Sequence, residues 1–141
     1  MSVSQLSVFV ENKTGRVAEV MRLVADQGLK VVGFTIADTI DYGIARLVVD
    51  RSDDAAAALR EQGFTIVDNQ VVCVETGEAG ADLASLVGLL SSSGINVEYM
   101  YLTTRHAAIV KVEDCRETER LLRENGFGVL DGEDLLAMGQ F

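Results

Sequence analysis

The sequence predicts an α+β protein of two similar tandem units, each with the element order β-α-β-β-α-β. The first observation is an internal repeat, because LSVFVENKTGRVAEVMRLVADQGLKVVGFTI is matched by VVCVETGEAGADLASLVGLLSSSGINVEYMYL later in the chain. The second is that ALREQGF at 58–64 recurs as LLRENGF at 121–127. A repeat of roughly 65 to 70 residues is too long for a solenoid unit and suits a small domain. We therefore expect a duplicated fold, with domains at 1–69 and 70–141.

Hydrophobic periodicity assigns the elements of the first half. Apolar and polar residues alternate near the start, which is typical of a strand with one buried face. Apolar residues then recur at i, i+3, i+4 and i+7 from Val17 to Val24, which predicts an amphipathic helix that ends near Gly28. Two β-rich runs joined by a polar stretch predict a hairpin, and Ser52 or Asp53 can cap a second helix. The expected elements are strands at 6–10, 31–36, 44–49 and 64–67, and helices at 17–24 and 52–60.

The second half repeats this pattern. Its expected elements are strands at 71–74, 97–102, 107–112 and 127–130, and helices at 83–90 and 118–123. The tail at 134–138 fits a short helix or an extra strand equally well. Each half is thus a ferredoxin-like split βαβ unit. We expect the two units to join in one antiparallel sheet of eight strands, with four helices on one face, because this arrangement covers two otherwise open edges.

Composition restricts the class of protein and its partners. The chain has 141 residues, 48% of them apolar, and a formal net charge of -10. No apolar run approaches the ~20 residues of a membrane span, and the start lacks the features of a signal peptide, so a soluble cytoplasmic protein without a membrane partner is expected. Nucleic-acid binding depends largely on Lys and Arg at phosphates, which makes nucleic acid an unsuitable partner for so acidic a chain.

Residues for catalysis or metal binding are scarce. His106 is the only histidine, and the two cysteines, Cys73 and Cys115, form no CxxC pair. Neither a nucleophile with its base nor a zinc-ligand set is recognisable. We therefore expect a protein that is not an enzyme, has no cofactor or metal, and keeps both thiols reduced and structural.

The run ENKTGRV, followed by a helix that closes at QGLKVVGF, resembles the ACT domain, a small regulatory module that binds amino acids. The second half, with SSGINVEYMY, is similar to the same family. The resemblance covers nearly the whole chain and is strongest to stand-alone tandem ACT proteins. It implies an effector held between paired units, by the first strand-helix loop of one unit and the second strand of its neighbour. It also implies a homodimer.

The residues of the first loop suit a free amino acid. A helix N-terminus offers unpaired backbone N–H groups to a carboxylate, and glycine lets a ligand approach the backbone closely. An asparagine amide both donates and accepts, so it can bridge the two ends of a zwitterion. The predicted site consists of Asn12, Lys13, Thr14, Gly15, Arg16, Val17, Asn96 and Val97. As structural alternatives, Gly15 could serve only a tight turn and Arg16 could be a solvated helix charge.

A weaker second site would pair the other loop with the other strand. It consists of Gly80, Ala81, Asp82, Leu83, Lys30 and Val31. The loop ETGEAGADL is acidic and so repels a carboxylate. The sequence thus favours a sensor of a free amino acid that acts on a partner metabolic enzyme. The alternatives are a structural dimerisation subunit with a vestigial site and an accessory protein of acyl- or aryl-group metabolism.

Overall fold

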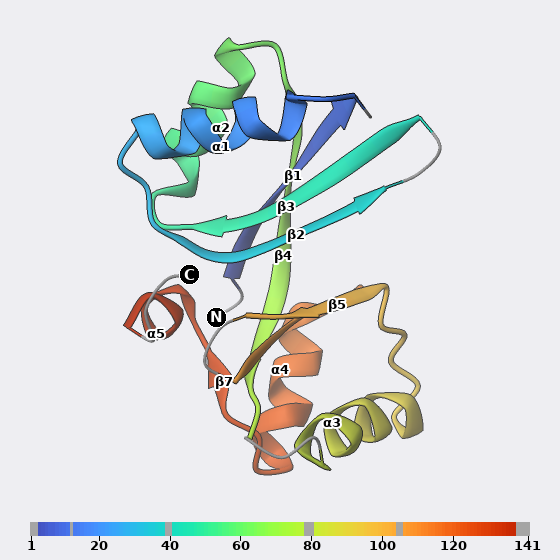
Figure 1. Cartoon of the computed structure of the whole chain (residues 1–141). Coiled ribbons are helices and arrows are strands. Elements are labelled where there is room, and N and C mark those ends of the chain that lie inside the picture. Colours follow the sequence, from blue (N-terminus) through green and yellow to red (C-terminus); the bar gives the residue numbers. More distant parts are fainter. Residues whose placement is uncertain (1–2, 12, 39–40, 78–80, 104–105, 138–141) are drawn as a thin grey trace. The chain divides into compact units, whose positions relative to one another are not determined.

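The computed structural model describes residues 3–11, 13–38, 41–77, 81–103 and 106–137 (Figure 1). Contacts within the chain group it into two compact units. We call Ser4–Asn69 the first unit, and the part that begins at Gln70 the second unit. The domain boundaries 1–69 and 70–141 remain a prediction about parts that fold independently.

The first unit has the expected order of elements. Its elements are β1 (Val3–Glu11), α1 (Arg16–Asp26), β2 (Val31–Asp38), β3 (Tyr42–Val49), α2 (Ser52–Glu61) and the first part of β4 (Thr65–Glu75). The strand order is β2-β3-β1-β4. Antiparallel register places Leu6 opposite Leu47 and Phe34 opposite that same leucine from the other side. Figure 1 shows α1 and α2 together on one side of these strands.

The core of the first unit lies between its sheet and this helical layer. Leu6, Val8 and Val10 alternate along β1 and are buried, and they pack with Val20 of α1 and Leu59 of α2. Removing each such side chain from water stabilises the fold by about 1.5–3 kcal/mol. The predicted apolar stripe of the first helix is confirmed, because Val20 and Val24 are buried while Val17 and Met21 pack at the margin of the core.

The second unit repeats the topology. Its elements are the rest of β4, α3 (Ala81–Ser92), β5 (Tyr99–Leu102), β6 (Ala107–Lys111), α4 (Cys115–Glu124), β7 (Val129–Leu130) and α5 (Gly132–Ala137). The strand order is β7-β4-β6-β5, the counterpart of β4-β1-β3-β2. Val72 and Val74 of β4 pack with Leu86 and Leu90 of α3 and with Leu122 of α4.

The strand β4 corrects the expected strand count. The predicted strands 64–67 and 71–74 are one element, so the described residues form seven strands in an antiparallel sheet rather than eight. The polar stretch between them is compatible with a strand because its side chains are bonded: Asp68 accepts from Ser4 at 2.7 Å, and Asn69 accepts from Ser7 at 2.9 Å. The expected joined sheet is confirmed, with hydrogen-bonded order β2-β3-β1-β4-β6-β5 and β7 on β4.

The tail at 134–138, for which the sequence fitted a short helix or an extra strand equally well, lies largely in the helix α5. Asp131 and Asp134 exchange hydrogen bonds at its start, the backbone N–H of each donating to the carboxylate of the other at 3.0 and 2.9 Å. Leu135 is buried. Burial raises the pKa of the Cys73 thiol to about 12, and the negative charge of Asp134 adds to this effect. Cys73 alternates along β4 with Val72 and Val74, so α5 approaches the sheet from the face opposite to α3 and α4.

None of the helices in the described ranges is long and apolar enough to cross a membrane.

Candidate functional site

The loop before α1 ends in an open helix N-terminus. Gly15 is the N-cap and has a left-handed backbone with φ 91°. No side chain caps the helix at this residue, and a Cβ added to Gly15 would meet nothing within 4 Å. Left-handed backbone is costly for residues with a Cβ, so glycine is favoured here. The Arg16 N–H donates to the Lys13 carbonyl at 3.3 Å, and the N–H groups that follow it in the first turn of α1 lie where a ligand can approach.

Two cations of the predicted site border this helix start. The Lys13 Nζ lies 3.1 Å from the Glu11 carboxylate, and this hydrogen bond together with the lysine charge lowers the pKa of Glu11. The Arg16 guanidinium lies 4.6 Å from the centroid of the Phe64 ring and forms an ion pair with Glu19. The aromatic contact and the ion pair fix the guanidinium on the unit's own surface. These contacts favour a packing role for Arg16, while its positive charge still borders the helix start.

The other members of the loop differ in exposure. Thr14 is exposed, and Val17 is half-buried against the core of the first unit. Asn12 lies outside the described residues. The structure thus defines the backbone of the predicted loop site from Lys13 to Val17.

The second-unit half of the predicted site lies before a strand rather than in one. The structure begins β5 at Tyr99, so Asn96 and Val97 belong to the connection that follows Gly94. Val97 packs against the core of the second unit. Asn96 is exposed and lines a hollow of about 550 Å³. Pairing with β6 starts only where the Glu98 backbone N–H donates to the Lys111 carbonyl at 2.9 Å, which explains the shorter strand.

The predicted weaker site contains a backbone group that is already engaged. The N–H of Lys30 donates to the Asp50 carboxylate at 2.6 Å, and Val31 packs against the first core. In the other unit, Leu83 packs against the second core. Ala81 and Asp82 begin α3, and Gly80 lies outside the described residues. An acidic side chain thus holds the amide that the counterpart site would offer to a ligand.

The sequence interpretation missed a second hollow. It measures about 320 Å³ and is lined by Glu75, Thr76, Gly77, Asn125, Gly126, Phe127 and Gly128. The N–H of Glu75 donates to the Gly128 carbonyl at 2.8 Å. A Cβ on Gly128 would lie 2.8 Å from a Glu75 carboxylate oxygen and 3.3 Å from the Glu75 Cβ, so a larger residue here would require the Glu75 side chain to shift. The glycines on both sides of Phe127, in the run GFG at 126–128, are the sequence feature that could have indicated this hollow.

Within the part of the chain that the structure describes, no group of three or more His, Cys, Asp or Glu residues could hold a metal ion. The thiol of Cys115 donates to the Gln70 carbonyl at 3.3 Å. Burial is the main cause that raises its pKa, which disfavours a reactive thiolate.

Comparisons with known proteins agree with this architecture. The family model for an ACT domain pair matches residues 1–138. The solved structure of protein BT0572 from Bacteroides thetaiotaomicron is 30% identical, with a TM-score of 0.89 and 96% of each chain covered. The regulatory subunit of aspartate kinase from Thermus thermophilus is 20% identical, with a TM-score of 0.64 and coverage of 87% of this chain and 90% of that one.

A search among curated proteins gave no match. The regulatory subunit of aspartate kinase from Thermus flavus has the same fold at 17% identity, with a TM-score of 0.64 and coverage of 88% and 92%. The repeated sheet-and-helix unit, the glycine-opened helix and the family match over residues 1–138 lead to one conclusion. The chain belongs to the family of ACT domain pairs.

Proposed function

We propose that this protein is a non-catalytic regulator that binds a free amino acid, with the α-carboxylate of that amino acid at the N-terminus of α1. The single observation that carries the proposal is the start of α1 at Gly15, left-handed, without a side-chain cap and with open space beside it. Such a helix start holds anions through backbone N–H groups and the positive end of the helix dipole.

The surroundings of this helix start support a zwitterion rather than a simple anion. Glu11 stands beside Lys13 at the end of β1, so the loop has a carboxylate near its cations. A zwitterion can place its ammonium near such a carboxylate and its own carboxylate at the helix start. In line with the sequence prediction, Asn12, Asn96 and Val97 would supply the remaining contacts.

The proposal includes regulation of a partner enzyme and a homodimer. The Thermus neighbours, whose names describe regulatory subunits of aspartate kinase, support regulation. Among the described residues, β2 pairs only with β3 and β5 only with β6, so each of these strands has an open edge. Ile36 on β2 and Leu102 on β5 are 45% and 55% exposed. Open edges with exposed apolar residues favour association with a second copy.

A thermal-shift screen of the free amino acids tests the proposal. An effector at ~100 times its Kd stabilises the protein by about 2.7 kcal/mol. The amide derivative of the effector, which lacks the carboxylate, is expected to give no shift. If no amino acid stabilises a protein that still dimerises, the scaffold alternative replaces the sensor.

A charge variant locates the site within the protein. Thr14→Glu puts a carboxylate beside the start of α1, where it competes with the carboxylate of the effector. We expect amino-acid binding about tenfold weaker, equal to ~1.4 kcal/mol, without loss of stability. Ala25→Glu is the matched control, because residue 25 is exposed near the other end of the same helix. Equal effects of the two variants would contradict a site at the helix start.

A further inference from the structure

Each of the two units has a helix corner of its own. We define the helix corner as the C-terminus of the first helix of the unit together with the N-cap of its second helix. In the first unit these are Gly28 and Arg51, and in the second they are Gly94 and Asp114. Both glycines have left-handed backbone, with φ 68° and 74°. Their N–H groups donate to the carbonyls of Ala25 at 2.9 Å and Ser91 at 3.1 Å. The two glycine turns therefore match, whereas the N-cap residues differ in backbone: Arg51 is left-handed with φ 49°, and Asp114 is extended with φ -116°.

A guanidinium occupies the corner of the first unit. The Arg51 Nη2 donates to the Gln27 carbonyl at 3.0 Å and reaches the Gly28 carbonyl at 3.4 Å. A Cβ on Gly28 would lie 4.0 Å from that nitrogen. The last carbonyls of a helix form the negative end of its dipole, and a cation there is stabilising. The first unit thus satisfies its corner with its own positive charge.

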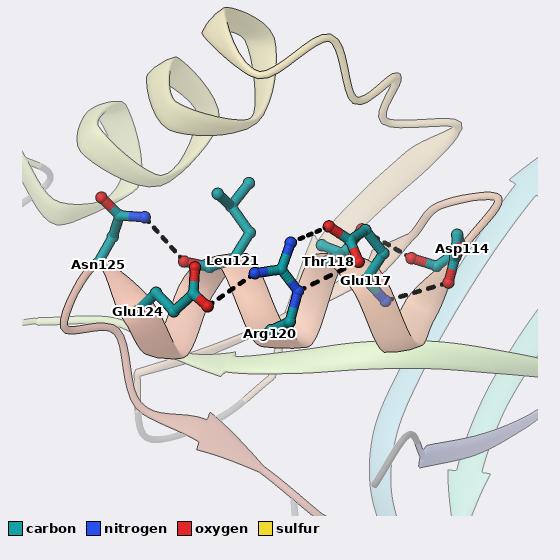
Figure 2. Close-up of polar contacts among 7 residues, drawn as sticks. All are labelled: Asp114, Glu117, Thr118, Arg120, Leu121, Glu124 and Asn125. Carbon is teal, nitrogen blue, oxygen red and sulfur yellow. Dashed lines mark hydrogen bonds and ion pairs between the residues drawn. The ribbon is translucent and has the colours of Figure 1, made fainter.

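The corner of the second unit has an acidic residue in the place of this cation. The Asp114 carboxylate turns toward its own helix and accepts from the Glu117 N–H at 3.1 Å (Figure 2). A Cβ on Gly94 would meet nothing within 4 Å, which matches the hollow of about 550 Å³ at this position. The hollow is lined by Gly94, Ile95, Asn96, Glu98, Glu113 and Asp114. The helix corner of the second unit is therefore open at the place where Arg51 fills the helix corner of the first unit.

The charges at this hollow favour a cation. Of its three carboxylates, Glu98 is paired with Lys111 at 3.4 Å and Asp114 caps α4. Glu113 is exposed and corresponds to Asp50, which in the first unit stands directly before the arginine. Ile95 packs against the core and offers an apolar surface for a short alkyl chain.

We propose that this hollow binds the guanidinium or ammonium group of a small cationic compound, which takes the position that Arg51 fills in the first unit. The cation donates to the last carbonyls of α3 and pairs with the Glu113 carboxylate, and the Asn96 amide accepts from it at the rim. The inference does not rest on the proposed function, although the two share Asn96. It assigns a cationic ligand to the second unit, whereas the proposed site at the start of α1 binds a carboxylate.

Titration with agmatine, followed by amide NMR shifts, tests the proposal. Agmatine carries a guanidinium and an ammonium but no carboxylate, so it lacks the group that the α1 site requires. We expect saturable shifts of the amides of Gly94, Ile95 and Glu113, and none with sodium chloride at equal ionic strength. No saturable shift of these amides at millimolar agmatine would overturn the proposal.

Two variants separate a specific site from general attraction to an acidic surface. Glu113→Gln removes one charge-assisted partner and should weaken agmatine binding about tenfold. Glu133→Gln is the matched control, since it removes an exposed carboxylate from α5, and it should leave binding unchanged. If both variants weaken binding equally, the attraction is non-specific and the site is refuted.

Asp114→Arg places an arginine in the second unit at the N-cap that Arg51 occupies in the first unit. It should abolish agmatine binding, because it replaces a carboxylate that lines the hollow with a positive charge that repels the ligand. Unchanged agmatine binding in a folded D114R protein would overturn the proposal, and if D114R does not fold, Glu113→Gln decides. Thr14→Glu should leave agmatine binding intact, so the inference and the proposed function can fail separately.

Discussion

Replacement of Gly15 by alanine tests whether α1 begins in open space with left-handed backbone. With φ 91°, a residue that has a Cβ experiences strain of about 1–2 kcal/mol. The alanine also reduces the entropy of the unfolded chain, which offsets roughly 0.4–1 kcal/mol of that strain. No steric cost is added, since a Cβ there meets nothing within 4 Å. We expect Gly15→Ala to lower the free energy of unfolding by about 1 kcal/mol.

Gly63→Ala is the matched variant, because Gly63 has φ 87° and the same open space in the same unit. Urea unfolding followed by circular dichroism should give nearly equal losses for the two variants. Only Gly15→Ala should weaken the binding of the amino-acid effector. A loss above ~3 kcal/mol at Gly15 alone would show that its surroundings are packed, and equal weakening of binding in both variants would refute the role of the helix start.

Three further outcomes follow from the structure. Burial keeps the Cys73 thiol neutral in the folded state up to about pH 12, whereas in the unfolded chain the thiol ionises near its ordinary pKa of 9.0. Stability should therefore fall above pH 9, by about 1.4 kcal/mol at pH 10. Cys73→Ala should remove this part of the pH dependence, and an unchanged slope would contradict it. Arg51 also has left-handed backbone with φ 49°, so Arg51→Gly should be more stable in urea than Arg51→Ala by roughly 1 kcal/mol; the reverse order would argue against strain there. Leu59→Ala should cost about 2–5 kcal/mol of unfolding free energy because Leu59 is fully buried between α2 and the sheet, and a loss below ~1 kcal/mol would conflict with that packing.

The sequence predicted the elements that depend on local periodicity. The stripe from Val17 to Val24 placed α1, and Gly28 and Gly94 marked the helix ends where left-handed backbone is found. These features depend on backbone preferences and on side-chain spacing, which can be read from neighbouring residues. The repeat then carried each assignment from one half to the other.

The differences arise where a distant residue decides the local structure. The polar stretch at 68–70 was expected to connect two strands, but Ser4 and Ser7 bond its side chains from β1 and keep it in β4. The strand was expected to begin at Val97, directly after Asn96, but pairing with β6 begins only at Glu98. Hydrophobic periodicity does not predict the bonds from Ser4 and Ser7 or the pairing with β6, because these partners lie far away along the chain.

The candidate site was predictable in its backbone and less so in its side chains. Gly15 and the helix start follow from the sequence, whereas the contact of Arg16 with Phe64 depends on residues far apart in the chain. Similarly, Arg51 and Asp114 are both N-cap residues, but the backbone of Arg51 is left-handed and that of Asp114 is extended, and their side chains bond to different groups, so one helix corner is filled and the other is open.

The most direct test of the account is an NMR titration of the protein with each free amino acid. The account predicts that at least one amino acid causes saturable shifts at the backbone amides of Arg16 and Val17, and that its carboxamide derivative does not. If no amino acid moves these amides in a folded, assembled protein, the proposed sensor function is contradicted.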